Sequence, residues 1–175
     1  MEQVILLSYP RSGNTWCRYI LEVCFAIRTF GYNSKIDIAP LLYTLNGFTQ
    51  YRNDICVIKR HNKIENFSGK EKLILISRDK DTAIQRQRQD SNAPYHAEND
   101  LYELNNAEYR KWEGSKMIIY YVDLLNHPEK VVSQLSDFLG IKAKPLGNVD
   151  SHRENSLKLY CEIGNNKSLT FNKNI

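Results

Sequence analysis

Apolar residues occur in four short, nearly continuous runs that are separated by longer segments of mixed character. The runs QVILLS (3–8), DICVIK (54–59) and KLILIS (72–77) are rich in Ile, Val and Leu, and each has the length of one strand. A fourth run, MIIYYV (117–122), has the same character. Strands that are buried on both faces carry such continuous runs, whereas half-exposed strands alternate. The pattern therefore predicts four strands of a sheet that is covered on both sides.

Between these runs, apolar residues recur at helical spacing. We predict helices over four segments: 14–30, 79–89, 98–112 and 127–141. Gly31 and Asn33 would end the first helix. Residues 32–54 resemble an irregular or short-helical insertion, and only LKLYCEI (157–163) is strand-like within the polar, Asn-rich segment 142–175. The order of strands and helices predicts a three-layer α/β fold with a largely parallel sheet flanked by helices.

The composition is that of one soluble globular domain. The chain has 175 residues, of which 42% are hydrophobic and 25% are charged, so we expect a single domain over 1–175. No signal peptide or long apolar run is visible, which predicts a cytoplasmic protein without a membrane partner. The net charge of +4 favours an anionic ligand, but it is too small to predict nucleic-acid binding.

The four cysteines lack the spacing of a metal site or a disulfide framework. They are Cys17, Cys24, Cys56 and Cys161, and no two of them form a CxxC pair. Cys17 and Cys24 lie seven residues apart on a predicted helix, so both should face the core as small hydrophobic residues. We assign them no chemistry, and a reducing compartment suits them.

A polar turn, YPRSGNTW (9–16), joins the first predicted strand to the first predicted helix. In an open α/β sheet, ligands bind beyond the carboxyl ends of the strands, where loops meet helix N-termini. Backbone N–H groups from Arg11 to Thr15 would form an anion-binding nest there, and the Ser12 and Thr15 hydroxyls and the Arg11 guanidinium would add donors. On spacing alone, the alternative is an ordinary turn in which a serine or asparagine caps the helix.

The turn is not a Walker A loop, because G-x-x-x-x-G-K-[ST] is absent and the basic residue precedes the glycine. Its eight residues instead resemble the 5′-phosphosulfate loop, Y-P-[KR]-S-G-x-T-W, of sulfotransferases that use 3′-phosphoadenosine 5′-phosphosulfate (PAPS). The resemblance implies a P-loop-like sulfotransferase fold. It also implies that the loop residues that bind PAPS are Arg11, Ser12, Gly13, Asn14, Thr15 and Trp16. In the family the tryptophan stacks on adenine, while burial in the core is the alternative for Trp16.

Three further segments resemble family motifs in the same order along the chain. The triplet KRH (59–61) resembles the K-x-H element, in which the histidine is the catalytic base. The strand KLILIS followed by Arg78 resembles the 3′-phosphate motif, in which the strand-end arginine holds the 3′-phosphate. Residues 118–141 resemble the segment Y-E-D-L and a helix ending in F-L-G, with Val122 in place of the usual glutamate. Taken singly, the triplet could be a solvated basic loop, and Arg78 could pair with an aspartate.

The chemistry that the resemblance implies can be tested against physical requirements. Transfer of a sulfuryl group to an acceptor hydroxyl or amine is similar to phosphoryl transfer, because charge grows on the bridging and equatorial oxygens during in-line attack. We expect Arg11 and Lys59 to stabilise this charge and His61 to accept the proton of the acceptor. The cofactor product is adenosine 3′,5′-bisphosphate (PAP). No metal is required, because fixed cations hold the phosphate leaving group.

The chain departs from the family pattern at two cofactor contacts. Arg86 stands eight residues after Arg78, where the family usually has a serine that donates to the 3′-phosphate. About two helical turns separate the two positions, so Arg86 can reach the same phosphate with a different geometry, or it can belong to a solvated helix face. Ser91 is a less well-spaced substitute. For the C-terminal loop that closes over the cofactor, only SHREN (151–155) offers itself, which makes Arg153 a candidate phosphate ligand.

The acceptor is the part of the site that the sequence does not identify. Segments 32–54 and 90–112 carry many aromatic residues, and we expect them to line a site for a small molecule or a saccharide. A reduced lid within 142–175 would leave this site open, and a homo-oligomer could complete it. Two alternatives stay open: a P-loop kinase that uses Mg²⁺, and a non-catalytic module that binds PAP or PAPS. Retention of both Lys59 and His61 favours the enzyme.

Overall fold

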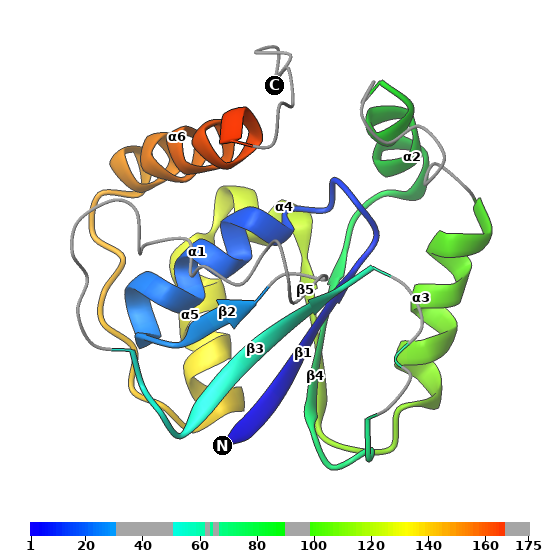
Figure 1. Ribbon diagram of the computed structural model, residues 1–175, viewed down its shortest axis with the longest axis horizontal. Helices are drawn as coiled ribbons and strands as arrows, with labels where there is room; N and C mark the ends of the chain where they lie inside the picture. The colour runs from blue at the N-terminus through cyan, green and yellow to red at the C-terminus, as the bar shows by residue number, and fades with distance from the viewer. Residues whose placement is uncertain (31–50, 62–63, 65–66, 90–98, 167–175) are drawn as a thin grey trace.

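Five parallel strands form the centre of the molecule, in the order β2-β3-β1-β4-β5 (Figure 1). The computed structural model describes residues 1–30, 51–61, 64, 67–89 and 99–166, with side chains in the last helix described as far as residue 157. The strands are β1 (Glu2–Ser8), β2 (Arg28–Phe30), β3 (Ile55–Arg60), β4 (Lys72–Ser77) and β5 (Lys116–Tyr120). The predicted α/β class with a parallel sheet is therefore confirmed.

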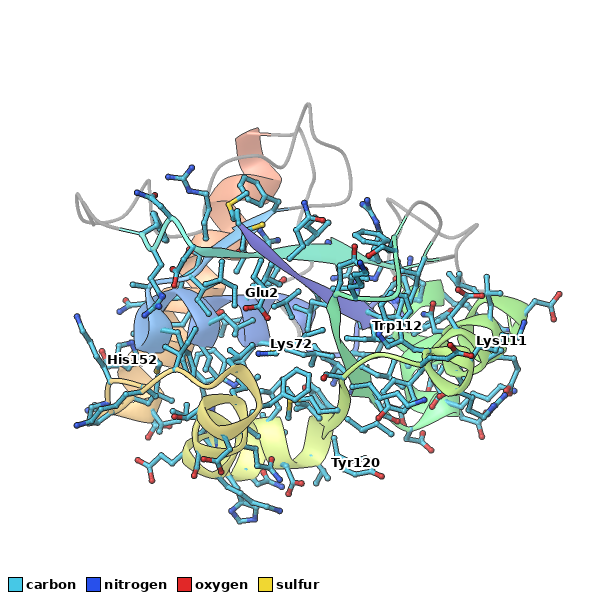
Figure 2. All side chains as sticks on the ribbon, turned by 90° about the horizontal axis from the view of Figure 1, so that it is seen from below. Glu2, Lys72, Lys111, Trp112, Tyr120 and His152 are labelled. Atoms are coloured by element: carbon cyan, nitrogen blue, oxygen red, sulfur yellow. The ribbon has the colours of Figure 1, made fainter. Side chains whose placement is uncertain are left out.

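Helices cover both faces of the sheet, as the continuous apolar runs predict. They are α1 (Asn14–Phe25), α2 (Lys80–Arg88), α3 (Asn99–Lys111), α4 (Tyr121–Asn126), α5 (Pro128–Leu139) and α6 (Val149–Asn166). Val4 and Leu6 of β1 join a core with α1 and α5, whereas Ile5 and Leu7 face a smaller core beneath α3. Figure 2 shows the two sides in another view, with His152 of α6 on one side and Trp112 beyond α3 on the other.

The first helix is shorter than we expected, and this part of the prediction is wrong. Helix α1 ends at Phe25, and Ala26 follows in the left-handed conformation with φ 54°. The Ala26 N–H bonds to the Glu22 carbonyl at 3.0 Å, which is the single bond of an αL cap, and the Ile27 N–H bonds to the Leu21 carbonyl at 3.3 Å. Residues 28–30 form strand β2 at the edge of the sheet instead of a final helical turn. The helix therefore ends at an alanine, well before the predicted stop at Gly31, which lies outside the described residues.

Two smaller expectations also fail in the C-terminal half. The fourth apolar run ends as a strand at Tyr120, and its last two residues begin helix α4. The segment 157–163, which we expected to be a strand, is helical and belongs to α6. That helix has a clear start, because the Ser151 N–H donates to the side-chain oxygen of Asn148 at 3.1 Å. Adding residues to an existing helix costs less free energy than starting a new one. The helix that begins after Asn148 therefore continues through the short alternating stretch 157–163.

The prediction for Cys17 and Cys24 is confirmed, because both lie in the core beneath α1. Burial raises the pKa of the Cys17 thiol to about 12 and that of Cys24 to about 11. Both thiols therefore stay protonated and poorly nucleophilic at neutral pH. In the part of the chain that the structure describes, no helix has both the length and the apolar character needed to cross a membrane.

Candidate functional site

The carboxyl ends of the three central strands bring the predicted site residues to one edge of the sheet. Strand β1 lies between β3 and β4, so the loop after it is flanked by the ends of both neighbours. Side chains of a strand alternate between its faces. Ile55 and Val57 of β3 face the core beneath α1, so Lys59 lies on that same face, beside the loop that leads into α1. The guanidinium of Arg60 lies over Phe67 at 5.5 Å, a residue of the opposite core.

The loop between β1 and α1 has the backbone of an anion nest. Arg11 and Gly13 both have positive φ, 64° and 88°, so they bracket Ser12 with left-handed residues. Gly13 is the residue that caps α1, and no side chain accepts a hydrogen bond there. The alternative of a serine or asparagine cap is therefore wrong. The first N–H groups of α1, including that of Thr15, lack a side-chain cap and lie where an anion can accept from them.

Two buried polar side chains of this loop have atoms without a partner among the described residues. Ser12 is fully buried, and its hydroxyl makes no hydrogen bond there. Asn14 is 6% exposed; its amide nitrogen donates to the Ser8 hydroxyl at 3.0 Å, but its amide oxygen has no partner. A buried polar atom without a partner costs about 1–3 kcal/mol. These atoms are therefore the places where a polar ligand would add most.

Gly13 is required at its position for two independent reasons. Its φ of 88° disfavours any residue with a Cβ, and an added Cβ would lie 2.8 Å from Cδ2 of Tyr121. Tyr121 is the first residue of α4, so the aromatic ring fixes the distance between this helix and the loop. No role for Tyr121 was predicted from the sequence.

Arg78, the residue that follows β4, points back to the loop. Its Nη1 donates to the Arg11 carbonyl at 2.5 Å, and its guanidinium carbon lies 4.1 Å from the centroid of the Tyr121 ring. The Asp79 carboxylate caps α2 by accepting from the Thr82 N–H at 2.8 Å. Arg78 therefore contacts the loop and an aromatic face, and the adjacent Asp79 carboxylate caps α2.

Charges of both signs act on Arg78, because Arg86, Tyr121 and Asp79 all interact with its guanidinium. Burial is the main cause that lowers the pKa of Arg78; Arg86 lowers it as well, whereas Tyr121 and Asp79 act in the opposite direction. Arg86 is exposed on α2, yet it is near enough to Arg78 for its charge to be felt there. Two guanidinium groups that repel one another are stabilised by an anion between them. Their arrangement matches the predicted pair of phosphate ligands, but it does not test that role.

His61 lies at the end of β3 with its ring orientation fixed by β1. Its Nδ1 lies 2.7 Å from the Ser8 carbonyl oxygen and 3.4 Å from the Ser8 hydroxyl. A carbonyl only accepts, so Nδ1 carries the proton and Nε2 is the basic nitrogen of the neutral ring. This is the tautomer that a general base needs.

Trp16 has structural contacts of its own. Its Nε1 donates to the Leu124 carbonyl of α4 at 2.9 Å, and its ring stacks on Tyr19 with centroids 5.6 Å apart. The ring is partly buried against the core beneath α1. The alternative of core packing therefore has direct support, while stacking on adenine stays a prediction.

The structure does not bring Arg153 to the other predicted ligands by any contact among the described residues. Arg153 pairs with Asp150 one turn earlier on α6, with Nη1 and the carboxylate 3.5 Å apart. Its neighbour His152 attaches α6 to α1, because Nδ1 lies 2.9 Å from the Tyr19 hydroxyl. The Nε of Arg153 is buried without a partner among the described residues. A phosphate contact by Arg153 stays a prediction.

A cleft of about 470 Å³ opens beside Arg78. It is lined by Ser77, Arg78, Asp79, Thr82, Tyr120, Tyr121 and Val122. Tyr120 and Val122 are 54% and 59% exposed, and Figure 2 shows Tyr120 projecting outward from the fold. The size suits a small-molecule ligand. Within the residues described, no three His, Cys, Asp or Glu side chains gather in a way that could hold a metal ion.

Comparisons with curated proteins find distant relatives. No family model matches the chain. It is 26% identical to WSCD family member CG9164 of Drosophila melanogaster over 157 residues, which cover 77% of this chain and 49% of the relative. WSCD family member GA21586 of Drosophila pseudoobscura pseudoobscura is 26% identical over 161 residues with the same coverage. The chain thus spans about half the length of the curated relatives that it matches.

Comparison with solved structures identifies the fold. The chain is similar to mouse sulfotransferase SULT7A1 complexed with PAP, with a TM-score of 0.58 and 16% identity over 91% of this chain and 66% of that chain. Retinol dehydratase in complex with androsterone and inactive cofactor PAP gives a TM-score of 0.47 and 15% identity over 95% of this chain and 67% of that chain. The first similarity shows that the chain has the fold of a sulfotransferase. The second is too distant to add to it.

Proposed function

We propose that this chain is a PAPS-dependent sulfotransferase that moves the sulfuryl group to an acceptor hydroxyl or amine and releases PAP. One observation carries the proposal. The anion nest, which has no side-chain cap, follows β1, and His61, whose Nδ1–H donates to the Ser8 carbonyl, follows the neighbouring strand β3. The nest supplies fixed donors for a phosphosulfate, and the histidine presents Nε2 as a base. SULT7A1, whose fold this chain shares, was crystallised with PAP.

In the proposed reaction each residue has one task. His61 accepts the acceptor's proton at Nε2 while the acceptor oxygen forms its bond to sulfur. The bond between sulfur and the bridging phosphate oxygen breaks, and PAP leaves with the electron pair of that bond. Arg11 and Lys59 stabilise the negative charge that develops on the bridging and equatorial oxygens. The backbone of Gly13 lets the phosphate approach the N-terminus of α1 closely.

We further propose that the 3′-phosphate lies between Arg78 and Arg86. The support is electrostatic: Arg78 lines a cleft of about 470 Å³, which is large enough for an adenosine moiety, and its charge interacts with that of Arg86. Arg86 follows the cleft residue Thr82 by four positions on α2, which places it about one helical turn further along the same helix. Tyr121 holds one face of the Arg78 guanidinium, which leaves the planar group oriented for bidentate contact. A metal ion has no assigned task in this scheme.

The nucleotide-dependent kinase is the less favoured alternative. A kinase of this fold class needs an acidic residue near a strand end to hold Mg²⁺. Arg78 follows β4 directly, and the Asp79 carboxylate is occupied with the N-terminus of α2. The acceptor of the sulfuryl group, a possible homo-oligomer and a cytoplasmic location belong to the same proposal as expectations.

Calorimetric titration tests the cofactor assignment directly. The purified chain would be titrated with PAP without metal, and separately with ADP in the presence of Mg²⁺. We expect metal-independent binding of PAP and at least tenfold weaker binding of ADP. Preference for ADP with Mg²⁺ would favour the kinase. Binding of neither nucleotide would contradict both proposals.

A further inference from the structure

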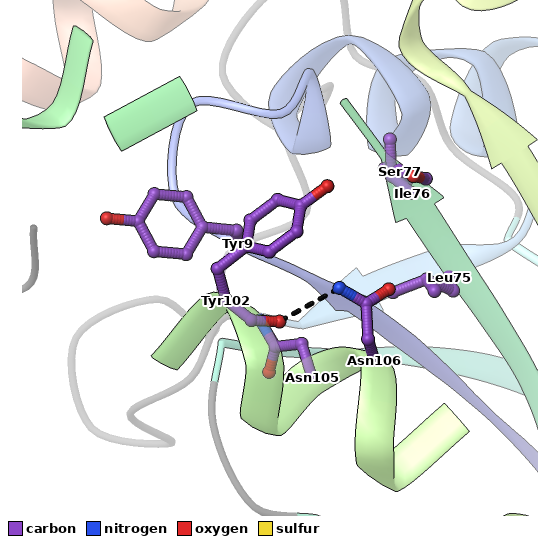
Figure 3. Close-up of a pocket in the computed structure, with 7 residues that line it drawn as sticks. All are labelled: Tyr9, Leu75, Ile76, Ser77, Tyr102, Asn105 and Asn106. Atoms are coloured by element: carbon purple, nitrogen blue, oxygen red, sulfur yellow. Dashed lines mark hydrogen bonds between the residues drawn. The ribbon is translucent and has the colours of Figure 1, made fainter. Parts of the chain in front are cut away.

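Tyr102 of α3 contacts both of the elements that the proposed site uses to hold anions, and Figure 3 shows it beside Tyr9. Its hydroxyl donates to the Arg78 carbonyl at 2.6 Å, at the end of β4. Its ring packs on Tyr9, the residue that follows β1, with centroids 5.7 Å apart and planes inclined by 57°. One side chain thus joins the strand end that carries Arg78 to the start of the anion loop.

These contacts close a ring of interactions. From Tyr9 the chain leads to Arg11, whose carbonyl accepts from the Arg78 side chain at 2.5 Å. The Arg78 main chain is held in turn by Tyr102, which packs back on Tyr9. A closed ring of this kind fixes distance more tightly than a single contact, because the loop cannot move away from Arg78 without breaking one of its members.

The packing around the ring leaves little freedom. Tyr9, Ala83 and Ile84 form a small buried cluster against which Tyr102 lies. The remaining space beside it is about 10 Å³, roughly the room for one water molecule. The side of the Tyr102 ring that faces this cluster is therefore closely packed.

We propose that Tyr102 is a positioning residue that sets the spacing between the anion loop and Arg78, and thereby the preference for ligands that carry two separated anionic groups. The inference rests on the proposed function, since it assumes that the loop and Arg78 hold the two phosphate groups of one nucleotide. It assigns to α3 a task in cofactor selection, in addition to the acceptor contacts expected of segment 90–112.

A substitution that keeps the ring isolates this role. Tyr102→Phe removes the hydrogen bond to the Arg78 carbonyl and retains the packing on Tyr9. Tyr109→Phe is the matched control, because Tyr109 lies two turns further along α3 and packs in the separate core under that helix. Both variants lose one phenolic oxygen, but only the first touches a proposed anion-binding element.

The experiment compares the affinity of wild type and both variants for PAP and for AMP, which lacks the 3′-phosphate. We expect Tyr102→Phe to weaken PAP binding by about five- to tenfold, the effect of one lost hydrogen bond at a site that demands exact spacing. AMP binding should change by less than about twofold, and Tyr109→Phe should change neither. Thermal melting would check that both variants are folded.

The outcomes separate the two proposals. Equal weakening of PAP and AMP binding would mean that Tyr102 acts only through general stability, and unchanged PAP binding would mean that it has no positioning role. Either result overturns the inference while leaving the proposed cofactor intact. Failure of the wild-type chain to bind PAP would overturn the proposed function and, with it, the inference.

Discussion

Removal of the His61 imidazole tests the proposed mechanism most directly. A general base accelerates proton transfer by about 100- to 10,000-fold, so His61→Asn should lower kcat by that factor, or about 2.7–5.4 kcal/mol in activation free energy. The asparagine amide can still donate to the Ser8 carbonyl, which the Nδ1–H of His61 contacts at 2.7 Å. The fold and the affinity for PAP should therefore change little, because the structural hydrogen bond is replaced.

His61→Ala provides the comparison, because it removes both the base and the hydrogen bond to Ser8. Loss of that bond costs about 0.5–1.5 kcal/mol, so its melting temperature should fall by about 1–6 °C. Activity would be followed as transfer from radiolabelled PAPS to a panel of phenols, amines and saccharides, with PAP affinity measured by calorimetry. Turnover of His61→Asn within about threefold of wild type would refute the assignment of the base, as would a loss of PAP affinity as large as the loss of kcat.

Three further predictions follow from single contacts. Arg78→Ala should weaken PAP binding by about tenfold or more and AMP binding far less, and equal weakening of both in calorimetry would contradict a 3′-phosphate contact. Gly13→Ala should destabilise the fold by about 1–2 kcal/mol, because alanine at a φ of 88° is strained, and should weaken PAP binding as well; wild-type melting and affinity would contradict the tight approach of Tyr121. Asn105 is 1% exposed, and neither polar atom of its amide has a partner among the described residues. Asn105→Leu should therefore raise the melting temperature by about 2–4 °C. The control Asn106→Leu loses a hydrogen bond to the Tyr102 carbonyl and should not raise it.

The parallel sheet could be predicted from the sequence because each central strand is a continuous apolar run. Such runs report burial on both faces, which depends on composition more than on detailed geometry. The end of α1 could not be predicted in this way, since it depends on Ala26 adopting a left-handed conformation and on Thr29. The Thr29 hydroxyl accepts from Nε of Arg18 at 3.0 Å, which attaches the short strand β2 to α1. A buried contact between polar side chains leaves no mark on hydrophobic periodicity.

For the candidate site too, local sequence motifs could be recognised, whereas contacts between residues distant in sequence could not. The loop, Lys59, His61 and Arg78 were assigned from their resemblance to sulfotransferase motifs, and their positions at or near strand ends bring them to one edge of the sheet, because parallel strands present their carboxyl ends there. The contacts of Tyr121 and Tyr102 with Arg78 could not be predicted, because Arg78 is distant from both of them in the sequence. The pair of adjacent tyrosines near the end of the fourth apolar run was a usable signal for Tyr121, but nothing local distinguishes Tyr102 from the other aromatic residues of its segment.

Arg86 provides a test of the proposed 3′-phosphate site. A serine at this place would add one neutral donor, whereas Arg86 adds a charge that lowers the pKa of Arg78. The repulsion between the two cations is unfavourable in the unliganded protein. A dianionic phosphate between them attracts both, so the total electrostatic energy becomes favourable. If Arg86 serves the 3′-phosphate, Arg86→Ser should therefore weaken PAP binding more steeply at low ionic strength than at high ionic strength. Calorimetry at about 20 mM and 500 mM salt would measure this, with Arg88→Ser on the same helix as the control. If Arg86→Ser and wild type bound PAP with equal affinity at both salt concentrations, Arg86 would belong to a solvated face and have no role in binding.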